Sequence, residues 1–219
     1  MKDQIIKTLK EKSVLKQKVY DQTINTFNIL KNIIRKIVIN YNAELEDDDA
    51  RIFLECKEDG EFAIELKVAG DLLIFNMHSN VFEFPNNHEI WRETNYVERP
   101  LITYSGIINI YNFLADSFKY DRSDDLGYLL GRIFINKDAS FFTDGIHELG
   151  FNYPVFNKNI VNVENLSKII ESAILYSLKF DLFVPNFNDV EEITVSYMKE
   201  KIITSKMRTA KRLGFKYSE

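Results

Sequence analysis

The stretch from Met1 to Tyr41 contains neither glycine nor proline, and this unbroken run limits the fold more than any other feature of the sequence. From Asp3 to Tyr41, apolar residues recur at spacings of four and three, the pattern of one face of an α-helix. The row begins with Ile5 and Leu9 and continues through Tyr20, Ile24, Phe27, Ile34, Val38 and Tyr41. We expect a single long helix over this stretch. It exceeds the roughly 8–20 residues common in globular domains, so the helix needs a break or a partner.

The two halves of this expected helix differ in their apolar surface. A second row at Leu30, Ile33 and Ile37 widens the stripe in the C-terminal half, although Lys31 occupies one slot. The wide half should lie on the core, and its stripe is also the candidate contact with a partner or a second copy. That candidate contact consists of Tyr20, Ile24, Phe27, Ile34 and Val38. The lysine-rich first half either projects into solvent or pairs with another helix.

A β-meander follows an acidic loop at residues 44–49. Apolar and polar residues alternate strictly along residues 52–57 and 62–68, and the pattern continues through residues 72–77 and 80–84. Turns at Glu58-Asp59-Gly60 and Ala69-Gly70-Asp71 separate the first three strands. Alternation with a period of two predicts a sheet with one buried face.

The rest of the chain combines helices with a hairpin. Ile107, Ile110, Tyr111, Leu114 and Phe118 fall at helical spacing, which predicts a helix over Gly106–Lys119. Residues 129–136 and 140–143 form a hairpin, and Asn162 is the expected N-cap of a helix over Val163–Phe180. A second helical segment should follow Pro185.

These elements define an α+β protein. Its antiparallel sheet should have about five to six strands, a meander plus a hairpin, packed by helices. We expect a single domain over residues 1–185 and a helical basic C-terminal tail over residues 186–219. Internal repeats and low-complexity linkers are lacking.

The composition of the chain indicates that the protein is located in the cytoplasm. Cys56 is the only cysteine, so an intrachain disulfide is impossible and a reducing compartment is expected. Charged residues interrupt the N-terminus where a signal peptide needs an apolar run. No uninterrupted apolar stretch approaches the ~18 residues of a membrane span. We therefore expect a soluble cytoplasmic protein that does not use a membrane.

Charge is distributed unevenly along the chain. Residues 1–40 hold nine basic and three acidic side chains, and residues 199–219 hold seven basic and two acidic ones. The middle of the chain is correspondingly acidic, since the net charge is -5. Basic ends can pack against this acidic body or a second copy of it, or they can bind an acidic partner, including nucleic acid. We favour the first interpretation.

The C-terminal tail supplies the best candidate for binding phosphates or an acidic partner. Its five basic residues are Lys206, Arg208, Lys211, Arg212 and Lys216. Phe215 and Tyr217 lie close by in the sequence, where aromatic rings could stack on bases. A solvated, frayed tail is the simpler interpretation.

Catalytic signals are sparse. Glu65-Leu66-Lys67 resembles the metal-binding part of the PD-(D/E)xK nucleases, in which carboxylates hold Mg²⁺. Cross-strand Glu–Lys pairs are also ordinary sheet stabilisers, which is the interpretation we favour. Zinc spacing, a nucleophile elbow, a P-loop and a dinucleotide fingerprint are lacking. We expect no metal and no cofactor. Enzymatic activity stays open, and we favour the interpretation that the chain has none.

The order of elements over residues 25–182 resembles the type III secretion chaperone-like fold, which the YbjN family shares. That resemblance implies a protein that dimerises and binds other proteins. Residues 109–119 and 127–145 are similar to an uncharacterised bacterial family of the Bacteroidetes type, which implies no function.

Three functions follow from these observations. We expect a non-catalytic binding or regulatory module that recognises a protein partner as a homodimer. The alternative is a nucleic-acid-associated factor that uses the basic ends. A PD-(D/E)xK-like nuclease is the remote alternative.

Overall fold

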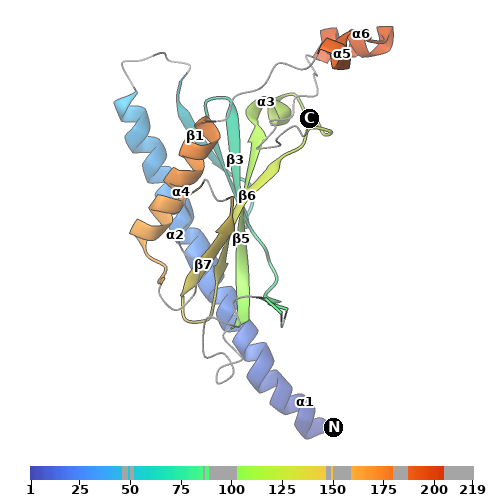
Figure 1. Ribbon diagram of the computed structural model, residues 1–219. Coiled ribbons are helices and arrows are strands. Elements are labelled where there is room, and N and C mark those ends of the chain that lie inside the picture. Colours follow the sequence, from blue (N-terminus) through green and yellow to red (C-terminus); the bar gives the residue numbers. More distant parts are fainter. Residues whose placement is uncertain are drawn as a thin grey trace.

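A long helix and one twisted antiparallel sheet dominate the computed structural model (Figure 1). The structure describes residues 1–45, 49, 52–85, 87–88, 103–146, 149, 159–179 and 187–204. Within these residues, no helix is both long and apolar enough to cross a membrane. The α+β class and the long N-terminal helix expected from the sequence are confirmed.

The N-terminal helix is continuous but changes its winding once. It comprises α1 (Lys2–Thr8), the π-helical turn η1 (Leu9–Ser13) and α2 (Val14–Glu44). α1 and η1 bury no side chain, whereas α2 buries ten. The expected division between an exposed first half and a core-facing second half is therefore confirmed. The buried threonines Thr23 and Thr26 donate their hydroxyl protons to the carbonyls of Val19 and Gln22, both at 2.7 Å.

The sheet is antiparallel throughout and follows the order β1-β2-β3-β5-β6-β7, with the short β4 paired to the beginning of β5. The meander consists of β1 (Leu54–Glu58), β2 (Ala63–Val68) and β3 (Asp71–Met77). The remaining strands are β4 (Phe82–Glu83), β5 (Tyr104–Leu114), β6 (Tyr128–Ile135) and β7 (Phe141–Gly145). The first three strands of the meander and the final hairpin are where the sequence placed them. The expected fourth meander strand over residues 80–84 is wrong in its pairing, because only the two residues of β4 form a strand and they pair with β5 and not with β3.

The expected helix over Gly106–Lys119 is wrong. Most of this segment is β5, the longest strand, and only α3 (Ala115–Lys119) is helical. β5 is a central strand between β3 and β6. Its apolar side chains point alternately to the two faces of the sheet. Ile108 and Ile110 are buried under the helices, while Ile107 and Tyr111 on the other face are half-buried. Because apolar residues lie on both faces of this strand, its sequence does not alternate between apolar and polar residues. The apolar residues therefore matched the spacing of a helix by chance.

Two helices cover one face of the sheet, which we call the inner face. α4 (Val163–Leu178) lies beside α2, as Figure 1 shows, and the two share one apolar core with the strands. Asn162 caps α4 as expected, because its side-chain oxygen accepts a hydrogen bond from the Asn165 backbone N–H at 2.8 Å. Phe27, Phe75 and Phe141 are the largest fully buried side chains of this core.

The helix approaches the sheet closely at Gly106. A Cβ atom added at Gly106 would overlap the Oγ1 of Thr23 and lie 2.7 Å from its Cβ. The small residue thus permits α2 to rest directly on the backbone of β5.

Lys31, which interrupts the apolar stripe in the sequence, is buried and paired. Its Nζ lies 3.1 Å from an Oε of Glu58, donates to the Glu61 carbonyl at 2.9 Å, and stands 5.0 Å from the Phe27 ring centroid. Arg35 pairs with the other oxygen of Glu58. Burial lowers the pKa of Lys31, and the nearby charge of Arg35 lowers it further. This cluster fixes α2 to the β1–β2 hairpin.

After α4, the structure describes two more helices, α5 (Phe187–Val190) and α6 (Val195–Thr204). The expectation that the tail is helical holds for α6. The part of the tail after residue 204 lies outside the described residues.

Candidate binding surfaces

The sequence predicted two binding sites, the basic residues of the C-terminal tail and the apolar stripe of the N-terminal helix. Lys206, Arg208, Lys211, Arg212 and Lys216 all lie outside the described residues. The helix stripe lies on the chain's own core, where Phe27 and Ile34 have no exposed surface. Tyr20, Ile24 and Val38 are partly buried against the same core. In this fold Phe27 and Ile34 therefore have no surface to offer a partner, because the sheet and α4 already use it.

The exposed surface of the helix lies nearer its beginning. We call residues 1–14 the N-terminal arm, because this segment extends past the end of the sheet (Figure 1). Every side chain of the arm is exposed, including five large apolar ones: Met1 (97%), Ile5 (54%), Ile6 (40%), Leu9 (55%) and Val14 (48%). Ile5 and Leu9 are four residues apart and thus share a helix face. The arm also carries four lysines against Asp3 and Glu11, and its π-helical turn is a feature that is common at functional sites.

The arm joins the body through a small cluster of its own. Leu15 and Val19 pack with Tyr104, which begins β5. The Tyr104 hydroxyl donates to an Oε of Glu83 at 2.8 Å, and the Nζ of Lys12 lies 3.9 Å from the same oxygen. Burial raises the pKa of Tyr104, and the hydrogen bond to Glu83 adds to that rise, whereas Lys12 opposes it. The arm is therefore anchored at its base.

The second surface is the sheet face opposite the helices, which we call the outer face. Its side chains form two rows across four strands. The first row, from the register of paired strands, is Glu55, Lys67, Leu72 and Phe113. The second row is Lys57, Glu65, Ile74 and Tyr111. In both rows the charged residues stand on β1 and β2 and the apolar residues stand on β3 and β5.

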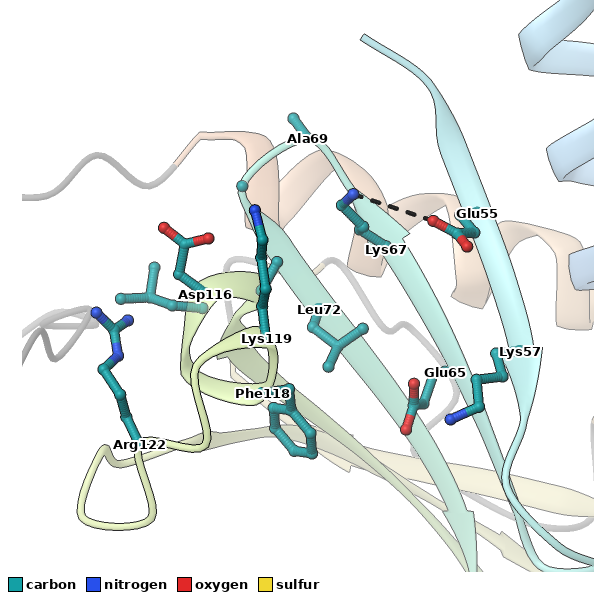
Figure 2. Close-up of a pocket in the computed structure, with 13 residues that line it drawn as sticks. Glu55, Lys57, Glu65, Lys67, Ala69, Leu72, Asp116, Phe118, Lys119 and Arg122 are labelled. Carbon is teal, nitrogen blue, oxygen red and sulfur yellow. Dashed lines mark ion pairs between the residues drawn. The ribbon is translucent and has the colours of Figure 1, made fainter. Parts of the chain in front are cut away.

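An open groove of about 750 Å³ runs over part of this face. One wall is the charged part of the two rows, Leu72 lies on its floor, and α3 forms the other wall (Figure 2). From α3, Phe118 lies over the sheet with 48% of its surface exposed, and its ring stands 5.1 Å from that of Phe113. Gly127 packs against the Phe113 ring so tightly that a Cβ atom there would overlap the ring.

The charged residues of the rows form a ladder of opposite charges, which we call the Glu/Lys ladder: Glu55 beside Lys67, and Lys57 beside Glu65. The Nζ of Lys67 lies 4.0 Å from an Oε of Glu55, and both side chains keep much of their surface exposed (Figure 2). The Glu-x-Lys motif that resembled a nuclease is part of this ladder. Among the described residues, no group of three His, Cys, Asp or Glu side chains could hold a metal ion.

The opposite end of the outer face is closed by aromatic side chains. Phe84, just after β4, lies 5.0 Å from Phe134 and 5.4 Å from Phe142, measured between ring centroids. Both of these strand residues are buried, whereas Ile74, Tyr111 and Phe118 keep exposed surface. Apolar surface thus remains accessible at the end of the outer face that carries the two rows and the groove, and the charged pair Arg132–Asp144 is exposed elsewhere on the same face.

Sequence reasoning identified the Glu/Lys ladder but missed its apolar continuation. Tyr111 and Phe113 were assigned to a helix, so their position beside Ile74 and Leu72 could not be inferred. The β-branched run Ile107-Ile108-Asn109-Ile110 was the available signal for a strand. Cys56 is half-buried and packs against the core.

Comparison of the chain with protein-family models, with curated proteins and with solved structures gave no match.

Proposed function

We propose that the chain is a protein-binding module whose N-terminal arm recognises an acidic partner protein through an apolar groove on that partner. The observation that carries this proposal is a helical segment, from Lys2 to Val14, without a single buried side chain. Four large apolar side chains on so short a segment are costly to leave in water. Full burial of one such side chain contributes about 1.5–3 kcal/mol.

The form of the arm favours binding as a helix. An isolated helix as short as the arm is marginal in water, but this one continues into α2 and is nucleated by it. The arm is therefore ordered before it meets a partner, which reduces the entropy cost of binding. Ile5 and Leu9 share one face, with Ile6 beside them, the spacing with which an amphipathic helix inserts into a groove.

The charge of the arm determines the kind of partner. Lys2, Lys7, Lys10 and Lys12 outnumber the two acidic residues, so the arm carries a net positive charge. A second arm would be repelled by this charge, whereas an acidic protein surface is attracted and steered toward it. Binding should consequently weaken as ionic strength rises.

The test separates apolar from charged contributions. Proteins captured from cells of the source organism by the wild-type chain are compared with those captured by Ile5→Ser/Leu9→Ser and by Lys7→Glu/Lys10→Glu. We expect at least one acidic protein to be lost with both variants and retained with the control Lys168→Glu/Lys179→Glu on α4 and its C-cap. That protein is then purified and titrated with the wild-type chain and the variants, at low and high salt.

Direct titration decides the outcome. The proposal predicts that affinity for the purified protein falls at least tenfold with either arm variant. Unchanged affinity would contradict it. Salt-sensitive binding of a fluorescent oligonucleotide that the lysine variant abolishes and the Ile5→Ser/Leu9→Ser variant leaves intact would instead support the nucleic-acid alternative.

A further inference from the structure

We infer that the outer face of the sheet binds the outer face of a second copy of this chain, about a two-fold axis that crosses the strands between the two rows. This inference is independent of the N-terminal arm, since it uses different residues at a different place in the fold. It rests on a match between the order of side chains in the two rows.

The two rows have complementary charges at every charged position. A two-fold axis between the rows places the first row of one copy on the second row of the other. Glu55 then faces Lys57 of the other copy, and Lys67 faces Glu65 of the other copy. Each of these contacts joins opposite charges, and the symmetry repeats each of them.

The apolar positions match about the same axis. Leu72 on β3, which is only 6% exposed, faces Ile74 of the other copy. Phe113 on β5 has the Phe118 ring of its own chain 5.1 Å away, so it faces Tyr111 of the other copy with Phe118 beside the contact. Apolar surface therefore meets apolar surface wherever charge does not meet charge. The two sheets would pack with their strands aligned, and they would lie further apart than the roughly 10 Å of directly stacked sheets, because α3 of each copy stands on this face.

Other arrangements of the same faces lack this match. A two-fold axis parallel to the strands, between β2 and β3, would place Lys67 on Leu72 and Glu55 on Phe113. Burying an unpaired charge against an apolar side chain is unfavourable. The pattern of the rows therefore selects one axis and one register, which is the property expected of a specific self-association surface.

The remaining surface at this end of the face supplies area. Stable interfaces bury roughly 800 Å² on each partner, which is more than the Glu/Lys ladder alone provides. Ile74 and Tyr111 are half-buried, and Phe118 beside them exposes 48% of its surface. These apolar groups supply the dispersion and hydrophobic contributions, while the ladder sets the register.

The test uses three charge variants of the full chain, measured by sedimentation equilibrium from about 1 to 100 µM. Lys57→Glu/Lys67→Glu makes the ladder uniformly acidic, so like charges meet across the axis and the dissociation constant should rise at least tenfold. Lys168→Glu/Lys179→Glu changes the net charge equally, but on α4 and its C-cap, and should leave the dissociation constant within about twofold of the wild type.

The third variant inverts the ladder: Glu55→Lys, Lys57→Glu, Glu65→Lys and Lys67→Glu together. Inversion preserves every pair within the chain and every pair across the axis, so this variant should dimerise as the wild type does. When it is mixed with the wild-type chain, like charges meet at all four positions. We therefore expect the two proteins to form separate homodimers and no mixed dimer, which differential tagging and native mass spectrometry can distinguish.

These measurements can overturn the inference in several ways. A wild-type chain that remains monomeric at 100 µM would do so, as would an inverted chain that is folded by circular dichroism and monomeric. Free mixing of the inverted and wild-type chains would show that the ladder does not set the register. The full-length Ile5→Ser/Leu9→Ser variant should still dimerise, which separates this interface from the N-terminal arm.

Discussion

The two faces of the sheet are built from alternate residues of the same strands, yet they have opposite properties. On β3, Leu73 and Phe75 point to the inner face and are completely buried beneath α2 and α4. Ile74, between them, points to the outer face and is only half-buried. The inner face buries the apolar surface that stabilises the fold. The outer face retains apolar surface that folding has not used.

Polar groups show the same division. On the inner side, Lys31 is almost fully buried and its charge is met by Glu58 and a backbone carbonyl. On the outer side, Glu55 and Lys67 pair at 4.0 Å with substantial exposure. Exposed pairs of this kind contribute only about 0–1 kcal/mol to stability. The Glu/Lys ladder therefore matters little for folding, and the charge pattern is free to serve recognition.

The largest expected difference between the faces is the cost of truncating an aromatic residue. Phe75→Ala should destabilise the fold by about 3–5 kcal/mol, because it leaves a cavity in the core. Tyr111→Ala on the outer face should cost under about 1.5 kcal/mol at a concentration where the chain is monomeric. Urea unfolding of the two variants measures this difference. Equal losses would remove the distinction between the faces.

The contact of α2 with the inner face should be nearly as sensitive. Gly106→Ala places a methyl group against Thr23, so either the helix or the strand must shift. We expect a loss of about 1–3 kcal/mol, as for other overpacked cores. Thr23→Ala removes two of the three clashing atoms and should restore part of the stability in the double variant. A Gly106→Ala chain as stable as the wild type would contradict the close approach.

A smaller effect concerns pH at the base of the arm. Burial raises the pKa of Tyr104 above its usual value of 10.0, so the folded state keeps this proton to a higher pH than the unfolded state does. Stability from this difference is present below about pH 10 and is lost as the pH rises through the folded-state pKa. Tyr104→Phe should lower the urea midpoint at neutral pH, because the bond to Glu83 is lost, and should reduce its fall between pH 9 and 11. An unchanged fall would exclude Tyr104 as a cause.

Much of the inner face could be predicted from the sequence, because its signals are local. Strict alternation defined β1 and β2, the spacing of apolar residues defined α2 and α4, and Asn162 marked the start of α4. β5 could not be recognised, since a central strand with apolar residues on both faces lacks the alternation of a half-buried strand. The burial of Lys31 depends on Glu58, which lies on a different element far along the chain, and no local pattern encodes such a contact.

The outer face required the structure. Its charged residues were visible as alternating Glu and Lys on two strands. Their alignment with Leu72, Ile74, Tyr111 and Phe113 depends on the register of four strands, which includes the misassigned β5. The exposure of the N-terminal arm was predictable, because its apolar row is narrow and its many lysines favour solvent.

The contrast between the two faces can be measured directly with a cysteine placed on each side of β3. In a Cys56→Ser background, Leu73→Cys and Ile74→Cys put a thiol at adjacent positions on the inner and outer faces. A thiol reagent should label Leu73→Cys slowly at every protein concentration. It should label Ile74→Cys rapidly at 1 µM and at least tenfold more slowly at 100 µM, as the second copy covers the outer face. Labelling of Ile74→Cys at the same rate at both concentrations would contradict the account.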